Sequence, residues 1–173
     1  NQGGVGSHNQ RDYLKKASSK GVKFINVSPL KSDLETVNNV EWVSIKPNTD
    51  VALILALCYE IDKSGATDRK FIDKYTVGFQ RFTKYLHGDI DGVIKNADWA
   101  SQITGLSSEA IFDLIKQIKK SKRTMISVSW SLTRQSHGEQ PYWAAIALAS
   151  IIGDIGKPGG GIGFGYSAMN SIG

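Results

Sequence analysis

The sequence predicts an α/β fold in which short parallel strands alternate with helices. Short runs rich in β-branched residues and bounded by turn residues indicate strands at 22–27, 41–45 and 124–129. Runs with helical periodicity separate these strands, and such crossovers favour a parallel sheet with helices on both faces. We therefore expect a dinucleotide-binding-like domain whose ligands lie outside the carboxyl ends of the strands.

The first strand follows a polar helix over residues 11–20, which Gly21 is suited to end. The strand itself closes at Ser28-Pro29, where dinucleotide folds place a polar residue against a ribose hydroxyl. The Ser28 hydroxyl can make that hydrogen bond, although less firmly than a carboxylate would. The alternative is a plain turn, which a Ser-Pro pair also favours.

The second strand is halted by Pro47, and Asn48-Thr49-Asp50 then opens a helix that is apolar nearly all round as far as Ile61. We expect this helix to be buried, with Cys58 as an inert structural thiol. Thr49 can cap a free amide, and Asp50 suits the helix dipole. Asp50 can also accept two hydrogen bonds from N1 and N2 of a guanine, and both interpretations stay open.

The segment 67–105 is predicted to form short helices, and we interpret it as a helical insertion. Its aromatic side chains recur at helical spacing, which indicates core packing rather than a cofactor site. Ser107 caps the next helix, whose apolar residues recur every three or four positions. The residues of the insertion expected in the core are Phe71, Ile72, Tyr75, Phe79, Phe82, Tyr85 and Leu86.

The third strand leads into three side chains that suit a nucleotide. Trp130 offers a stacking face and one donor, Ser131 a hydroxyl, and Arg134 a planar fork suited to a pyrophosphate. Each of them can also be structural. His137 has no carboxylate and nucleophile at a catalytic spacing, so we assign no catalytic residue.

The last helix begins near Glu139, carries Pro141 in its first turn and ends at Gly153. The glycines that follow form no phosphate loop of the familiar kind. We expect them to permit tight turns and close backbone approach.

Composition excludes several classes of function. The 173 residues are 40% hydrophobic and 21% charged, which fits one globular domain or one lobe of a larger protein. The net charge of +5 tolerates an anionic ligand, but the lysines are scattered without interleaved aromatic residues, so we expect no nucleic-acid partner. The longest apolar run, 142–152, is far short of a membrane span. The single cysteine excludes an internal disulfide and a thiolate metal cluster.

Two segments near the carboxyl end are more specific than these patterns. They read WSLTRQSHGEQPYW at 130–143 and GDIGKPGGGIGFGY at 153–166, with support from PNTD at 47–50, FIDKYTVGF at 71–79 and ADWA at 97–100. Together they closely resemble the dimethyl sulfoxide reductase family of molybdenum enzymes. Within it, the chain is most similar to the branch of trimethylamine N-oxide, dimethyl sulfoxide and biotin sulfoxide reductases. The resemblance runs from about Val22 onward.

The resemblance implies a cofactor and its contacts. The family holds molybdenum in two molybdopterin guanine dinucleotides, and the matching segment forms an α/β lobe of a larger multidomain enzyme that grips one of them. By this resemblance, residues 1–173 are part of the guanine-dinucleotide-binding domain, and the glycine run after Ile155 packs beside the pterin. The cofactor contacts carried over by motif are Ser28, Pro29, Asn48, Thr49, Asp50, Trp130, Ser131 and Arg134.

The resemblance also has two departures. Relatives commonly carry Asp where this chain has Ser28. The serine that ligates molybdenum in this branch lies upstream of the matching region, so no residue here is assigned as a metal ligand.

The activity implied is reduction of an S-oxide or N-oxide by oxygen-atom transfer, with electrons from an external donor such as a c-type cytochrome. The alternatives are a non-catalytic module that binds or inserts the cofactor, and an ordinary nucleotide-binding α/β domain. Relatives include exported and cytoplasmic enzymes, and a periplasmic location is favoured. Since there is no initiator Met, we expect the sequence to be a piece of a longer protein.

Overall fold

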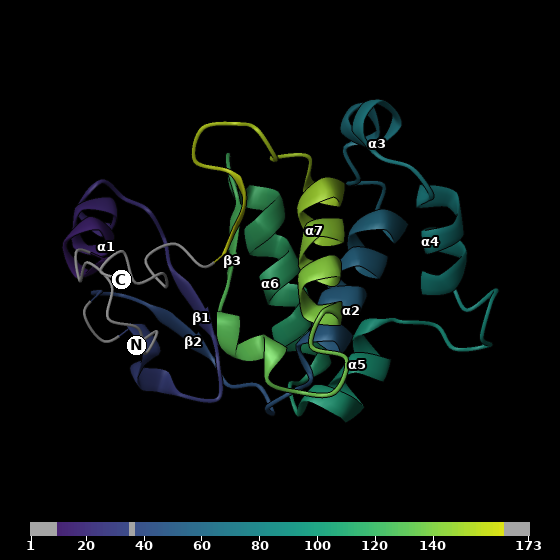
Figure 1. Cartoon of the computed structure of the whole chain (residues 1–173), viewed down its shortest axis with the longest axis horizontal. Helices are drawn as coiled ribbons and strands as arrows, with labels where there is room; N and C mark the ends of the chain where they lie inside the picture. Colours follow the sequence, from purple (N-terminus) through teal and green to yellow (C-terminus); the bar gives the residue numbers. More distant parts are fainter. Residues whose placement is uncertain (1–9, 35–36, 165–173) are drawn as a thin grey trace, which may run out of the picture.

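A computed structural model describes residues 10–34 and 37–164 (Figure 1). The predicted α/β class is confirmed, because strands and helices are mixed along the chain and both strand pairings are parallel. The strands are β1 (Ile25–Val27), β2 (Glu41–Val43), β3 (Met125–Val128) and β4 (Gly161–Phe164). The helices are α1 (Gln10–Ser19), α2 (Asp50–Lys63), α3 (Arg69–Tyr75), α4 (Phe79–Leu86), α5 (Ala97–Thr104), α6 (Ser108–Lys120) and α7 (Gln140–Ile152), and 3₁₀ turns occur at η1 (Lys31–Leu34) and η2 (Trp130–Thr133).

The strands form two separate parallel pairs where the sequence predicts one sheet. β1 pairs with β2, with Ile25 opposite Glu41, and β3 pairs with β4, with Met125 opposite Gly161. The glycine run contains the predicted turns and also β4, which the sequence does not predict because glycine is a poor strand former. Pairing compensates for that weakness, and the Gly161 amide also donates to the carbonyl of Thr124 at 3.0 Å.

Helix α2 lies at the centre of the core, as its apolar sequence predicts. It packs against α4, α5, α6 and α7, and α7 in turn contacts β3 and β4. Cys58 is fully buried within α2, and that burial raises the pKa of its thiol, so it is the inert residue we expect. Along the long axis of the molecule, α1, β1 and β2 occupy one end, and α3 and α4 occupy the other (Figure 1).

The segment 67–105 folds into α3, α4 and α5, in agreement with the predicted short helices. Ile72 and Leu86 are buried as expected, but Tyr75 is 63% exposed, so its assignment to the core is wrong. Tyr75 is the last residue of α3, where its ring packs at a tilt against Phe71 with a centroid distance of 5.0 Å, and the Lys74 ammonium lies 5.0 Å from the Tyr75 ring centroid. The predicted cap of α6 is confirmed, because Ser107 Oγ accepts a hydrogen bond of 3.2 Å from the Ala110 amide.

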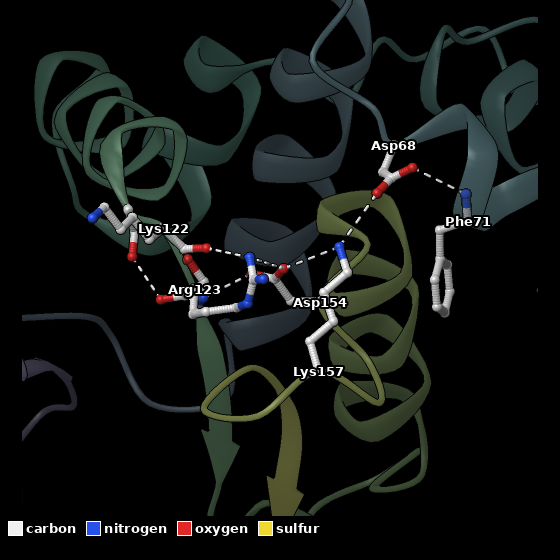
Figure 2. A network of polar contacts seen from close by, with 8 residues as sticks. Asp68, Phe71, Lys122, Arg123, Asp154 and Lys157 are labelled. Carbon is white, nitrogen blue, oxygen red and sulfur yellow. Dashed lines mark hydrogen bonds and ion pairs between the residues drawn. The ribbon is translucent and has the colours of Figure 1, made fainter.

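A buried carboxylate, Asp154, joins the elements at the edge where β3 begins. Its Oδ2 accepts a 2.8 Å hydrogen bond from the Thr124 amide, and its Oδ1 lies 3.5 Å from Lys157 Nζ. Lys157 Nζ also lies 3.6 Å from Asp68 Oδ2, and Asp68 Oδ1 caps α3 by accepting from the Phe71 amide at 3.0 Å. Figure 2 shows the contacts from Asp154 through Lys157 and Asp68 to Phe71 as one continuous network. The network therefore connects β3, the carboxyl end of α7 and the amino end of α3.

We expect Gly153→Ala to lower the free energy of unfolding by about 2–3 kcal/mol. Gly153 has φ of 77°, which costs an alanine about 1–2 kcal/mol, and a Cβ there would overlap the Asp68 carboxylate and disturb the cap of α3, worth about 1 kcal/mol. Gly156 is the matched control, because it has φ of 80° and open space around its Cβ position. Urea unfolding followed by circular dichroism measures both variants, and equal losses would contradict the role given to the Gly153 contact.

Candidate functional site at the strand ends

The strands β1, β2 and β3 all end towards the lower edge of the view in Figure 1. The predicted site residues lie on three turns that follow these strands: 28–29 after β1, 48–50 between β2 and α2, and 130–134 after β3. This is the edge at which parallel α/β folds bind ligands. The hydrogen bonds within each turn show which polar groups already have partners in the protein.

In the turn after β1, the amide, carbonyl and hydroxyl of Ser28 all form hydrogen bonds within the protein. Its amide donates to the carbonyl of Val43 at 3.2 Å, and its carbonyl accepts from Trp42 Nε1 at 2.9 Å. Its hydroxyl oxygen accepts from the Leu30 amide at 3.1 Å, which agrees with the plain turn, while Pro29 is exposed beside it. The ribose contact of Ser28 stays a prediction.

Trp42 is a residue of this edge that the sequence analysis does not identify. It is 39% exposed and lines a surface pocket of about 600 Å³ together with Lys31, Asn38 and Asn39. The sequence signal that could have identified Trp42 is its position in the alternating strand 41–45, because alternation places every second side chain on the open face.

The turn before α2 leaves the first helical amides without a side-chain cap. Thr49 Oγ1 donates to the carbonyl of Lys46 at 2.7 Å, so the predicted cap by the Thr49 hydroxyl is wrong. The physical reason is that the hydroxyl turns back to close the loop, where Asn48 adopts a left-handed φ of 64°. The amino end of α2 therefore keeps its positive dipole at the strand-end edge, while the Ala52 amide donates to the Thr49 carbonyl at 3.1 Å.

Asp50 is the first residue of α2 and is half-buried. Burial raises the pKa of its carboxyl above the usual range, since desolvation outweighs the hydrogen bond from its own amide. It forms no ion pair with another residue in the described ranges 10–34 and 37–164. A half-desolvated carboxylate of this kind is suited to a ligand that donates hydrogen bonds.

The turn after β3 is a 3₁₀ turn, η2, and not a direct continuation of the strand. The carbonyl of Trp130 accepts from Thr133 Oγ1 at 2.8 Å, and the carbonyl of Ser131 accepts from the Arg134 amide at 2.9 Å. Trp130 is 44% exposed. Arg134 is exposed and forms no ion pair with any residue that the structure describes. The structure thus brings Trp130, Ser131 and Arg134 together on one turn.

Two further residues hold this turn, and the sequence analysis does not identify either of them. Ser129 Oγ accepts from the Ser131 amide at 3.3 Å and caps η2. Tyr142, in the first turn of α7, donates its hydroxyl to the carbonyl of Ser129 at 2.8 Å. Burial raises the pKa of Tyr142, and the nearby Arg134 guanidinium opposes that rise.

The loop between η2 and α7 contains His137 and Gly138. His137 is largely exposed, with Nδ1 3.9 Å from the carboxylate of Glu139. Gly138 is buried, and a Cβ there would overlap the backbone of Thr133, so η2 packs directly on the glycine. Among the described residues, no group of three or more His, Cys, Asp or Glu side chains is arranged to hold a metal ion.

A family model for molybdopterin oxidoreductase matches residues 6–171 of this chain. The chain belongs to the molybdopterin oxidoreductase family. The biotin sulfoxide reductase of Cereibacter sphaeroides is 48% identical over 171 residues, which cover 99% of this chain and 23% of that protein. The trimethylamine-N-oxide reductase of Haemophilus influenzae is 40% identical over 92% of this chain and 19% of its own length. The dimethyl sulfoxide/trimethylamine N-oxide reductase of Rhodobacter capsulatus is 38% identical over 94% and 20%.

A solved structure supports the same fold. Acetylene hydratase from Pelobacter acetylenicus superposes with a TM-score of 0.71 at 22% identity, over 87% of this chain and 20% of that one. The predicted family and fold are therefore confirmed, and the chain spans about a fifth of the length of the curated relatives it matches.

Membership of this family implies a molybdenum–pterin cofactor. The side chains at the strand ends fit an anionic group that also donates hydrogen bonds, because Arg134 is an exposed cation and Asp50 a half-buried carboxylate. In the described part of the chain, no helix is long and apolar enough to span a membrane.

We expect Asp50→Asn to make the folded chain more stable at pH 7. Because burial raises the pKa of Asp50 in the folded state, the wild type loses stability as pH rises from the usual Asp range through the raised pKa. The variant lacks this loss, so the stability difference should grow with pH and vanish at the acid end. Urea unfolding between about pH 4 and pH 8 measures it, and a variant less stable than wild type at pH 7 would contradict the desolvation of Asp50.

Proposed function

We propose that this chain is the guanine-dinucleotide-binding lobe of a molybdenum-dependent enzyme that reduces an S-oxide or N-oxide. The names of its relatives support the reaction class, since they are biotin sulfoxide, trimethylamine-N-oxide and dimethyl sulfoxide reductases. The observation that carries the cofactor-binding role is Asp50, a half-buried carboxylate at the strand-end edge with no ion-pair partner among the described residues.

Asp50 supports the guanine form of the cofactor. The two carboxylate oxygens can accept from N1–H and N2–H of guanine, which are parallel donors on one edge of the base. Adenine has no such pair, so the contact is specific. Because Asp50 is already partly desolvated by the fold, its hydrogen bonds to a bound base are stronger than those of an exposed carboxylate.

The turn after β3 would bind the rest of the tail. The Arg134 fork is free to pair with the pyrophosphate, Ser131 offers a hydroxyl, and the exposed face of Trp130 can stack on a ring. Asn48 and Thr49 lie beside Asp50, where the uncapped amino end of α2 attracts negative charge. Ser28 and Pro29 would contact the tail from the end of β1.

The residues of this chain bind and orient the cofactor, and when bound, the molybdenum and its dithiolene ligands supply the redox chemistry. The net reaction converts the oxygen of the oxide to water with two electrons and two protons. We propose that the electrons come from an external donor such as a c-type cytochrome, and that the enzyme acts in the periplasm.

We expect Asp50→Ala and Arg134→Ala each to lower the molybdenum and pterin content of the full-length protein by about tenfold, as loss of a charge-assisted hydrogen bond worth about 1.5–3 kcal/mol implies. Asp73→Ala and Arg81→Ala are matched controls, because both residues are exposed on α3 and α4, away from the strand ends. Elemental analysis and the fluorescence of oxidised pterin measure the content. Unchanged loading in both site variants would refute their cofactor role.

The reductase activity is tested on the loaded full-length protein with biotin sulfoxide, trimethylamine N-oxide and dimethyl sulfoxide, with a reduced dye as the electron source. We expect turnover of at least one of the three. A fully loaded protein that reduces none of them would contradict the enzyme and favour a non-catalytic module that binds or inserts the cofactor.

A further inference from the structure

The carbonyl of Ser129 accepts two hydrogen bonds at the point where β3 becomes η2. One comes from the Leu132 amide inside the turn, at 3.3 Å, and the other comes from the hydroxyl of Tyr142, at 2.8 Å. The first bond is long and belongs to the turn itself. The second is short and connects the turn to a different element, α7.

The two sides of this second bond differ in rigidity. A four-residue 3₁₀ turn has poor hydrogen-bond geometry and little stability of its own. Helix α7 is held by its packing against α2, β3 and β4, and most of its residues are buried. The Tyr142 hydroxyl therefore makes a direct hydrogen bond from the well-packed helix α7 to a weak turn.

The chemistry of Tyr142 suits this role. Burial raises the pKa of its hydroxyl, so the group stays a protonated donor throughout the physiological range. Its ring has only two side-chain torsions, and they are set by a well-packed helix, so the direction of the donated hydrogen bond is fixed. The influence of Arg134 on the same pKa shows that the cation lies within electrostatic reach of the phenol.

We propose that Tyr142 is a positioning residue that holds the 130–134 turn in the orientation needed to bind the guanine dinucleotide. This inference rests on the proposed function of the strand-end edge. The hydroxyl would act through Ser129 and not on the cofactor itself. Its loss should loosen the turn and weaken cofactor binding by Trp130, Ser131 and Arg134 together.

The test is Tyr142→Phe in the full-length protein, which removes one oxygen and keeps the ring. Ser150→Ala is the matched control, because Ser150 lies on the same helix, is buried, and donates its hydroxyl to the carbonyl of Ile146 at 2.8 Å. We measure hydrogen exchange at the Leu132 and Arg134 amides, molybdenum and pterin content, and Tm for both variants.

We expect Tyr142→Phe to speed exchange in the turn by about fivefold and to lower cofactor content by a similar factor, as loss of one hydrogen bond implies. Its Tm should stay close to that of Ser150→Ala, and Ser150→Ala should leave exchange in the turn unchanged.

Either of two results would overturn this inference and leave the proposed function standing. One is a Tyr142→Phe protein that loads as fully as wild type with unchanged exchange in the turn. The other is a global fall in Tm with faster exchange throughout α7, which would make the hydroxyl a core contact and not a positioning group. A wild-type protein that carries neither molybdenum nor pterin would instead overturn the proposed function, and this inference with it.

Discussion

The buried carboxylate of Asp154 is the interaction on which the rest of this lobe depends. A buried charge is costly unless it is paired and hydrogen-bonded, so Asp154 requires the Thr124 amide on one side and the Lys157 ammonium on the other. Lys157 also pairs with Asp68 at the start of α3, so the pairing of Asp154 involves that helix as well. Gly153 has no side chain, and a Cβ at this position would overlap the Asp68 carboxylate, so the network is tightly packed here.

This arrangement divides the lobe into two edges with different tasks. At the edge where β3 begins, the charged groups of the network pair with one another and stabilise the fold. At the edge where the strands end, Asp50 and Arg134 have no ion-pair partner among the described residues, and the hydroxyl of Thr49 turns away from the helix it could cap. Groups left in this state cost stability in the unliganded chain, and a ligand that pairs them recovers that cost.

Much of the fold follows from local sequence patterns, and the site follows only in part. The apolar run that forms α2, the Ser107 cap and the Gly153 stop are each determined by residues close together in sequence, so periodicity and capping rules find them. Strand β4 is missed because its pairing with β3, and not its own glycine-rich composition, makes it a strand. Tyr142 is missed for the same reason, since its partner Ser129 lies across a loop and no local pattern connects them. Residues that bind a ligand can be proposed from their chemistry alone. Residues that orient the binding residues can be found only from the structure.

We propose above all that the guanine end of the cofactor binds at the strand ends. Determination of the structure of the full-length protein with its cofactor tests it most directly. We expect N1 and N2 of one guanine to lie about 2.6–3.2 Å from the Asp50 carboxylate, with the pyrophosphate within reach of Arg134. A guanine bound away from Asp50, with that carboxylate facing water, would contradict it.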